Sequence, residues 1–131
     1  MTYAAKTKVP VSQSKAEIER TVMRYGATSF VAGSSLIDGA MICFEMNDRR
    51  VMFRTAMPDD EQQTRAKWRA LLLCIKAKLE SVESGIESFE NAFMAHVVMP
   101  DGRTVGEHIR PRIATAYAEG KMVPLLPGPS Q

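Results

Sequence analysis

Histidine, cysteine and carboxylate side chains are the groups that could support catalysis or hold a metal ion in this chain. The only two histidines, His96 and His108, are separated by twelve positions, and no cysteine or carboxylate accompanies them at the spacing of a zinc or iron site. Glutamates could act as acids or bases beside them, although glutamates spaced three or four apart on a helix are more often solvated or capping. The sequence therefore predicts no metal, no cofactor and no catalytic residue.

Cys43 and Cys74 are the two candidate nucleophiles. Each lies in an apolar segment without a neighbouring base, which predicts small buried thiols in a reducing compartment rather than a disulfide. Of the two, Cys43 has the better expectation of exposure. The chain also lacks a glycine-rich phosphate loop, a nucleophile elbow and a nucleotide fingerprint. We therefore expect a cytoplasmic protein that is not an enzyme.

Basic residues concentrated between positions 49 and 78 are the strongest chemical signal. Eight of the 17 Lys and Arg residues fall in this stretch. Such a density suits contacts with phosphate groups, which supply most of the sequence-independent affinity for nucleic acid. The alternative is that these charges solvate a helix and pair with nearby carboxylates. The residues that we expect to bind a partner are Arg49, Arg50, Arg54, Arg65, Arg69 and Lys76.

Two classes of partner are compatible with these residues. The first, which the basic residues favour, is DNA or RNA, bound by a replication or recombination accessory. The second is a host or phage protein, such as a defence or regulatory complex that this chain would inhibit, because Arg and Met are also enriched at protein interfaces. A formal net charge of +2 does not decide between them. A homo-oligomer is compatible with both.

The first two predicted helices surround the β portion of the chain. Ser14, followed by a glutamate three residues later, forms a capping-box pattern that predicts a helix over 15–25. Acidic residues after Pro58 and apolar residues at helical spacing predict a long helix that ends at Gly85.

Two further helices are predicted near the C-terminus. A short helix covers 88–96, and a capping-box pattern at Thr104 begins another that ends at Gly120. Pro111 lies inside the second one, where it is expected to kink the helix or to delay its start. Residues 121–131 are expected to form an extended tail.

Between the first two helices, turn residues divide a segment rich in strand formers into three parts. The predicted strands cover 28–32, 40–46 and 50–57, with Gly33-Ser34-Ser35 ending the first. Residues 1–10 are expected to form an edge strand or a mobile arm.

Alternation along the second and third strands assigns their side chains to two faces. The face expected to lie in the core carries Ile42, Phe44, Met46, Val51, Phe53 and Thr55. The opposite face carries Met41, Cys43, Glu45, Arg50, Met52 and Arg54.

The size and composition of the chain complete the expected architecture. Its 131 residues, 45% hydrophobic and 24% charged, predict one globular domain over 1–131. No apolar run approaches the roughly 20 residues of a membrane-spanning helix, so no membrane partner is expected. We predict an α+β fold with a three- or four-stranded antiparallel sheet packed on one face by helices, in the order (β)-α-β-β-β-α-α-α. The C-terminal helices are expected to pack against the long helix.

Part of the sequence resembles a known group of proteins. Residues 75–85 (IKAKLESVESG), then Phe89-Glu90, then 99–107 (MPDGRTVGE) are similar to small conserved uncharacterised proteins encoded by bacteriophages and integrated elements. The similarity extends back to Ser14 and forward to Leu126. It implies a phage-derived origin and a cytoplasmic setting in a host cell, and it implies no active site.

Overall fold

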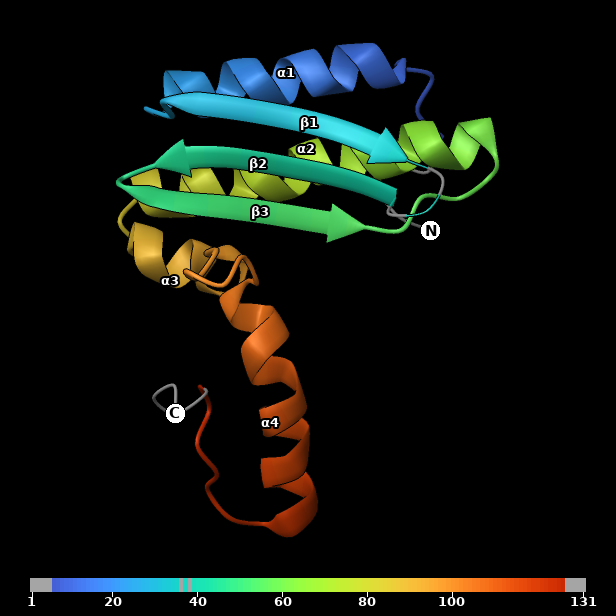
Figure 1. Cartoon of the computed structure of the whole chain (residues 1–131). Coiled ribbons are helices and arrows are strands. Elements are labelled where there is room, and N and C mark those ends of the chain that lie inside the picture. The colour runs from blue at the N-terminus through green and yellow to red at the C-terminus, as the bar shows by residue number, and fades with distance from the viewer. Residues whose placement is uncertain (1–5, 36, 38, 127–131) are drawn as a thin grey trace.

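The computed structural model describes residues 6–35, 37 and 39–126 and has an α+β fold, as the sequence predicts (Figure 1). Three antiparallel strands form a sheet in the order β1-β2-β3. The elements are α1 (Val11–Arg24), β1 (Ser29–Ser35), β2 (Gly39–Met46), β3 (Arg49–Thr55), α2 (Glu61–Glu83), α3 (Phe89–Phe93), the short 3-10 helix η1 (Met94–His96) and α4 (Val105–Glu119).

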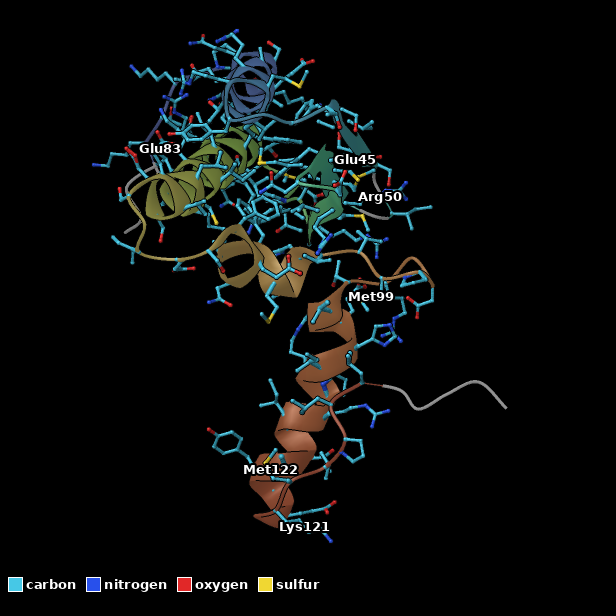
Figure 2. All side chains as sticks on the ribbon, turned by 90° about the vertical axis from the view of Figure 1, so that its left-hand side faces the viewer. Glu45, Arg50, Glu83, Met99, Lys121 and Met122 are labelled. Carbon is cyan, nitrogen blue, oxygen red and sulfur yellow. The ribbon has the colours of Figure 1, made fainter. Side chains whose placement is uncertain are left out.

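α1 and α2 pack against each other and against the same face of the sheet. Figure 2, turned by 90°, shows both of them on one side of the strands. The core between these layers confirms the predicted inner face of β2 and β3, and Phe93 of α3 closes it with an edge-on contact to Phe44, at 5.9 Å between ring centroids. Its most deeply buried large side chains are Ile18, Val22, Ile42, Phe44, Val51, Trp68, Leu72, Ile75, Leu79 and Phe93.

The long helix α2 forms where it is predicted. The carboxylate of Asp60 accepts a hydrogen bond from the backbone N–H of Gln63 at 2.8 Å, which satisfies a free amide of the first turn. Trp68, Leu72, Ile75 and Leu79 then recur at intervals of three or four residues, so that one stripe of the helix is buried. Among the described residues, no helix is both long and apolar enough to cross a membrane.

The first helix begins earlier than predicted, at Val11. The carbonyl of Pro10 accepts hydrogen bonds from the backbone N–H groups of Gln13 and Ser14, so the helix is already formed where the capping box was expected to begin it. Ser14 is fully buried within the helix, and its hydroxyl has no hydrogen-bond partner among the described residues. Proline is compatible with this N-cap position because its carbonyl accepts the first hydrogen bonds of the helix and its missing N–H is not needed there.

The first strand is longer than predicted, because it continues through Gly33 to Ser35 instead of breaking there. Pairing with β2 causes this: Gly33 lies opposite Met41 and Ser35 lies opposite Gly39, so ladder hydrogen bonds outweigh the weak strand preference of glycine and serine. The predicted N-terminal strand over 1–10 is not found in 6–10, and 1–5 lie outside the described residues. The described sheet therefore has three strands.

α4 continues through Pro111 instead of starting after it. Proline has no N–H to donate to the carbonyl of Glu107, four residues earlier. The guanidinium of Arg103 donates to that carbonyl instead, at 3.3 Å, and replaces the missing hydrogen bond. The capping box of Thr104 and Glu107 and the left-handed Gly120 at the other end are as predicted.

The expected packing of the C-terminal helices on the long helix is correct for α3 and wrong for α4. α4 contacts η1, has no buried residue and projects away from the rest of the protein (Figure 1). Its first turn determines this direction, because the N–H of Val105 donates to the carbonyl of Val97 at 2.9 Å and directs the helix outwards. We call the body formed by α1, the sheet, α2, α3 and η1 the head, and α4 with residues 120–126 the arm.

The prediction that both cysteines are buried is also wrong. Cys74 is exposed and Cys43 is partly buried, the reverse of their expected order. Leu72 and Ile75 occupy the core-facing stripe of α2, and at about 100° per residue Cys74 falls outside it.

Candidate binding surface on the open sheet face

The side of the sheet opposite α1 and α2 carries both apolar and charged side chains. Strand register aligns the side chains of this side in three rows across the sheet. We call this surface the open face. Its rows are Ser29–Glu45–Arg50, Val31–Cys43–Met52 and Gly33–Met41–Arg54.

The central row is apolar, and its accessibility decreases from β1 to β3. Val31 is 58% exposed, Cys43 is partly buried and Met52 is only 9% exposed. The first turn of α4 and η1 shield Met52, and a cavity of about 460 Å³ lies beside it, bordered by His96 and Arg110. The accessible part of the row is therefore its β1 and β2 end.

Each arginine at the rim of the open face has a carboxylate partner. Arg50 lies 3.8 Å from Glu45 on the neighbouring strand, and the two side chains lie together in Figure 2. Arg54 lies 3.1 Å from Glu107 in the first turn of α4. The rim is thus polar but close to electrically neutral.

The other predicted binding residues lie elsewhere. Arg49 is the first residue of β3 and binds Glu90 of α3 at 3.2 Å. The three remaining residues belong to α2, on the opposite side of the sheet from Arg50 and Arg54. The structure therefore divides the predicted basic surface between two sides of the protein.

The α2 residues of this set are also largely paired. Arg69 contacts Glu17 of α1 at 2.8 Å, and Arg65 contacts Glu61 at 2.9 Å and also Gln62. Lys76 is exposed and has no carboxylate within ion-pair distance in the described part of the chain. Five of the six predicted residues, all except Lys76, thus lie in ion pairs.

Hydrogen bonds keep two of the partner carboxylates ionised. The backbone N–H of Thr104 holds the pKa of Glu107 below its ordinary value, with help from the Thr104 hydroxyl and Arg54. The side chain of Gln13, together with Arg69, lowers the pKa of Glu17. These carboxylates therefore stay negative near neutral pH and continue to offset the arginines beside them.

Aromatic side chains are not available for stacking on the open face. Phe44, Phe53, Trp68 and Phe93 are buried in the core, and the rows of the open face contain no aromatic residue. Platforms for single-stranded nucleic acid commonly use aromatic rings on which bases stack. The open face has instead the apolar centre and polar rim that are typical of protein interfaces.

The histidines and cysteines do not form a reactive cluster. His108 contacts Asp101 at 2.8 Å. Glutamates, and not this aspartate, were the carboxylates considered as partners of the histidines. Burial raises the pKa of the Cys43 thiol, which therefore stays protonated at neutral pH. Within the described residues, no group of three or more His, Cys, Asp and Glu could hold a metal ion.

His96 is stacked on Phe53 with 3.9 Å between ring centroids. Its environment predicts how the stability of the protein depends on pH. Burial lowers its pKa below the ordinary 6.5, and the nearby charges of Lys78 and Arg110 act in the same direction. The unfolded chain therefore takes up this proton at a higher pH than the folded protein does. Stability is complete above about pH 6.5 and is expected to fall as the pH drops through the lower folded pKa.

Urea unfolding at a series of pH values measures this effect. His96→Phe keeps a ring against Phe53 but cannot take up a proton, so its stability should change less between about pH 7 and pH 5. The carboxylates of Glu17 and Glu107 have lowered pKa values and act only in a more acidic range. An equal loss of stability in wild type and variant would contradict the role given to His96.

Sequence reasoning identified the β2 and β3 residues of the open face, six of its nine, and missed its β1 edge. Val31 was not singled out, although alternation from Ser29 to Ser35 places it on the same face as Met41 once the strand is known to continue past Gly33. The pairing of Arg54 with Glu107 spans 53 residues, and no local pattern reveals it.

The fold and this surface together define a small α+β protein with an apolar, charge-balanced sheet face and a projecting helix. The chain matches no known protein-family model, and no curated protein or solved structure is significantly similar to it.

Proposed function

We propose that this chain is a binding protein, not an enzyme, and that the open face binds a protein partner. The observation that supports this is the apolar Val31–Cys43–Met52 row, which is accessible at its β1 and β2 end and lies between rims whose arginines are already paired with carboxylates. The phage-type origin and a role in inhibiting a host complex are part of the same proposal and rest on the resemblance of 75–107. An affinity for DNA or RNA is the competing hypothesis.

Charge pairing favours a protein partner over nucleic acid. Affinity for a phosphate backbone comes from cations that release counterions, and a cation already beside a carboxylate contributes less to that release. Arg50 and Arg54 are paired, and Arg69 lies on the other side of the sheet. A single nucleic-acid strand therefore does not meet the predicted residues as one positive surface.

Val31→Glu tests the open face directly. A charge at the accessible end of the apolar row should weaken partner binding by at least about tenfold, because a carboxylate would be buried without a partner in an apolar contact. Ile37→Glu is the matched control, since Ile37 is 93% exposed in the β1–β2 turn and lies outside the three rows. Affinity capture from phage-infected cells with wild type and both variants, with and without nuclease, identifies the partner. Calorimetry then measures its affinity.

Salt dependence separates the two hypotheses. A protein partner should be retained after nuclease treatment, should be lost with Val31→Glu, and should change little in affinity between low and moderate salt. A nucleic-acid partner held by several phosphate contacts would instead lose affinity by about 10³-fold or more over the same range. Retardation of DNA or RNA in a gel, unaffected by Val31→Glu and reduced by Lys76→Glu, would replace the protein hypothesis with the nucleic-acid one.

A further inference from the structure

We propose that the arm is a self-association device, in which α4 packs antiparallel against α4 of a second copy about a two-fold axis at Ile113. This interface is separate from the open face and does not depend on the function proposed for it. The helix is regular over 15 residues although none of them is buried. Isolated helices of about 12–15 residues are only marginally stable in water, so packing must supply the rest.

One side of α4 is prepared for such packing. Gly106 faces η1 so closely that a Cβ at this position would lie 2.9 Å from the carbonyl oxygen of Ala95. Ile113 and Tyr117 follow seven and eleven residues later and therefore share this side of the helix. Among the described residues both side chains are exposed, Ile113 by 44% and Tyr117 by 87%.

The described part of the tail, residues 120–126, leaves this stripe exposed. Residues 120–126 run back beside α4 (Figure 1), and Arg112 donates to the carbonyl oxygen of Pro124 at 2.9 Å. At about 100° per residue Arg112 lies about 140° around the helix from Tyr117. Residues 120–126 therefore lie on another side of the helix. Met122 among them is 84% exposed at the far end of the arm (Figure 2).

The arm is held in a fixed direction, as an interface requires. Glu107 takes part in the capping box with Thr104 and in the ion pair with Arg54, which joins the first turn of α4 to β3. The close approach of Gly106 to Ala95 adds a contact with η1. A preformed surface costs less entropy to bind than one that must first be ordered.

A second copy fits the stripe because the stripe is symmetric about Ile113. Ile109 and Tyr117 each lie four residues from it, and Gly106 and Gly120 each lie seven residues from it. An antiparallel pair centred there places Ile109 against Tyr117 of the second copy. Gly120 of the second helix lies seven residues, or about 10 Å along the helix, from the two-fold axis, so it lies at the level of Gly106 and η1 of the first copy.

The corner at η1 would receive the end of the second arm. Met94 of η1 is 45% exposed. Met122 lies two residues after Gly120, the C-cap of α4. The end of each arm, with Met122, would thus pack against η1 of the other copy, where Met94 is exposed. Such an isologous interface is closed and does not extend into a filament.

The accessible surface leaves room for this interface. The chain exposes 8652 Å², whereas a compact protein of its mass, 14.5 kDa, exposes about 6,900 Å². Part of this surplus lies on the projecting arm, and a standard interface takes roughly 800 Å² from each partner.

Sedimentation velocity over a range of micromolar concentrations tests the proposal. Wild type should sediment as a dimer, and Ile113→Glu should sediment as a monomer, because the axis would place two carboxylates together in an apolar contact. Ile37→Glu, an equally drastic change at an exposed position of the head, should leave the dimer intact. Circular dichroism verifies that the head stays folded, and Tyr117→Glu provides a second variant with the same expected loss.

Cysteine cross-linking tests the antiparallel geometry. In a Cys43→Ser, Cys74→Ser background, Ile113→Cys should form an intermolecular disulfide readily, whereas Ala118→Cys, exposed on another side of α4, should not. A mixture of Ile109→Cys and Tyr117→Cys chains should give the mixed disulfide. A monomeric wild type, a dimer that survives Ile113→Glu and Tyr117→Glu, or equal cross-linking at 113 and 118 would each overturn the proposal. Loss of partner binding by Val31→Glu would not change these results.

Discussion

Trp68→Ala is expected to lower the free energy of unfolding by about 3–5 kcal/mol, the usual cost of removing a large buried aromatic side chain. Trp68 is the largest fully buried residue, with 1% of its surface exposed, and belongs to the core between α1, α2 and the sheet. The amino group of Lys15 lies 4.8 Å from the centroid of its ring, a contact that would also be lost. Urea unfolding followed by circular dichroism measures the change.

Lys67→Ala is the matched control, because Lys67 is the neighbouring residue on the same helix and is exposed. Its effect should stay within about 0.5 kcal/mol. If Trp68→Ala unfolded at the same urea concentration as wild type, Trp68 could not be the centre of the core described here.

Gly39→Ala is the second substitution with a large expected effect. Gly39 has φ +75°, and a Cβ there would lie 2.3 Å from the carbonyl oxygen of Thr55 and 2.9 Å from the Cα of Ala56. Neither atom can move without displacing the end of β3 from β2. The strain of positive φ and the forced displacement together should cost about 2–5 kcal/mol.

Gly85→Ala separates these two causes. Gly85 has the same φ, +75°, but a Cβ there would meet nothing within 4 Å. Its cost should therefore be the conformational part alone, about 1 kcal/mol. Equal destabilisation by the two substitutions, measured by thermal unfolding, would show that the contact with Thr55 does not constrain the sheet.

A dimer through the arms would have a direct consequence for binding. Each copy would carry its own open face on its own head, so that one assembly would present two binding surfaces. When two linked surfaces engage the same target, the second binding event becomes intramolecular and the overall affinity rises without any new contact. Ile113→Glu would then weaken binding to a target with repeated sites while leaving the affinity of each single site unchanged.

Local sequence patterns were sufficient for the elements whose ends are determined within one turn. Thr104 and Glu107 begin α4, and Gly120 ends it in the left-handed conformation. Alternation in β2 and β3 correctly separated the core face from the open face, because every second residue of a strand points to the same side. Where a competing interaction acted, the pattern failed: Pro10 began α1 before Ser14 could cap it.

Tertiary structure alone decided how the charged residues are grouped. Arg54 meets Glu107 across 53 residues and Arg69 meets Glu17 across 52, distances over which local spacing carries no information. These pairs form because β3 lies beside the first turn of α4, and because α1 lies beside α2.

The direction of α4 shows the same division between sequence and structure. Ile113 and Tyr117 lie four residues apart and therefore share a side of the helix, and this helix was expected to pack against the long helix. The sequence alone determined that this helix has a side in need of packing, because the spacing of apolar residues fixes which side chains share a face. Only the fold decided that the head does not supply that packing, because the contact of Gly106 with Ala95 and the backbone bond from Val105 to Val97 direct the helix away from the core.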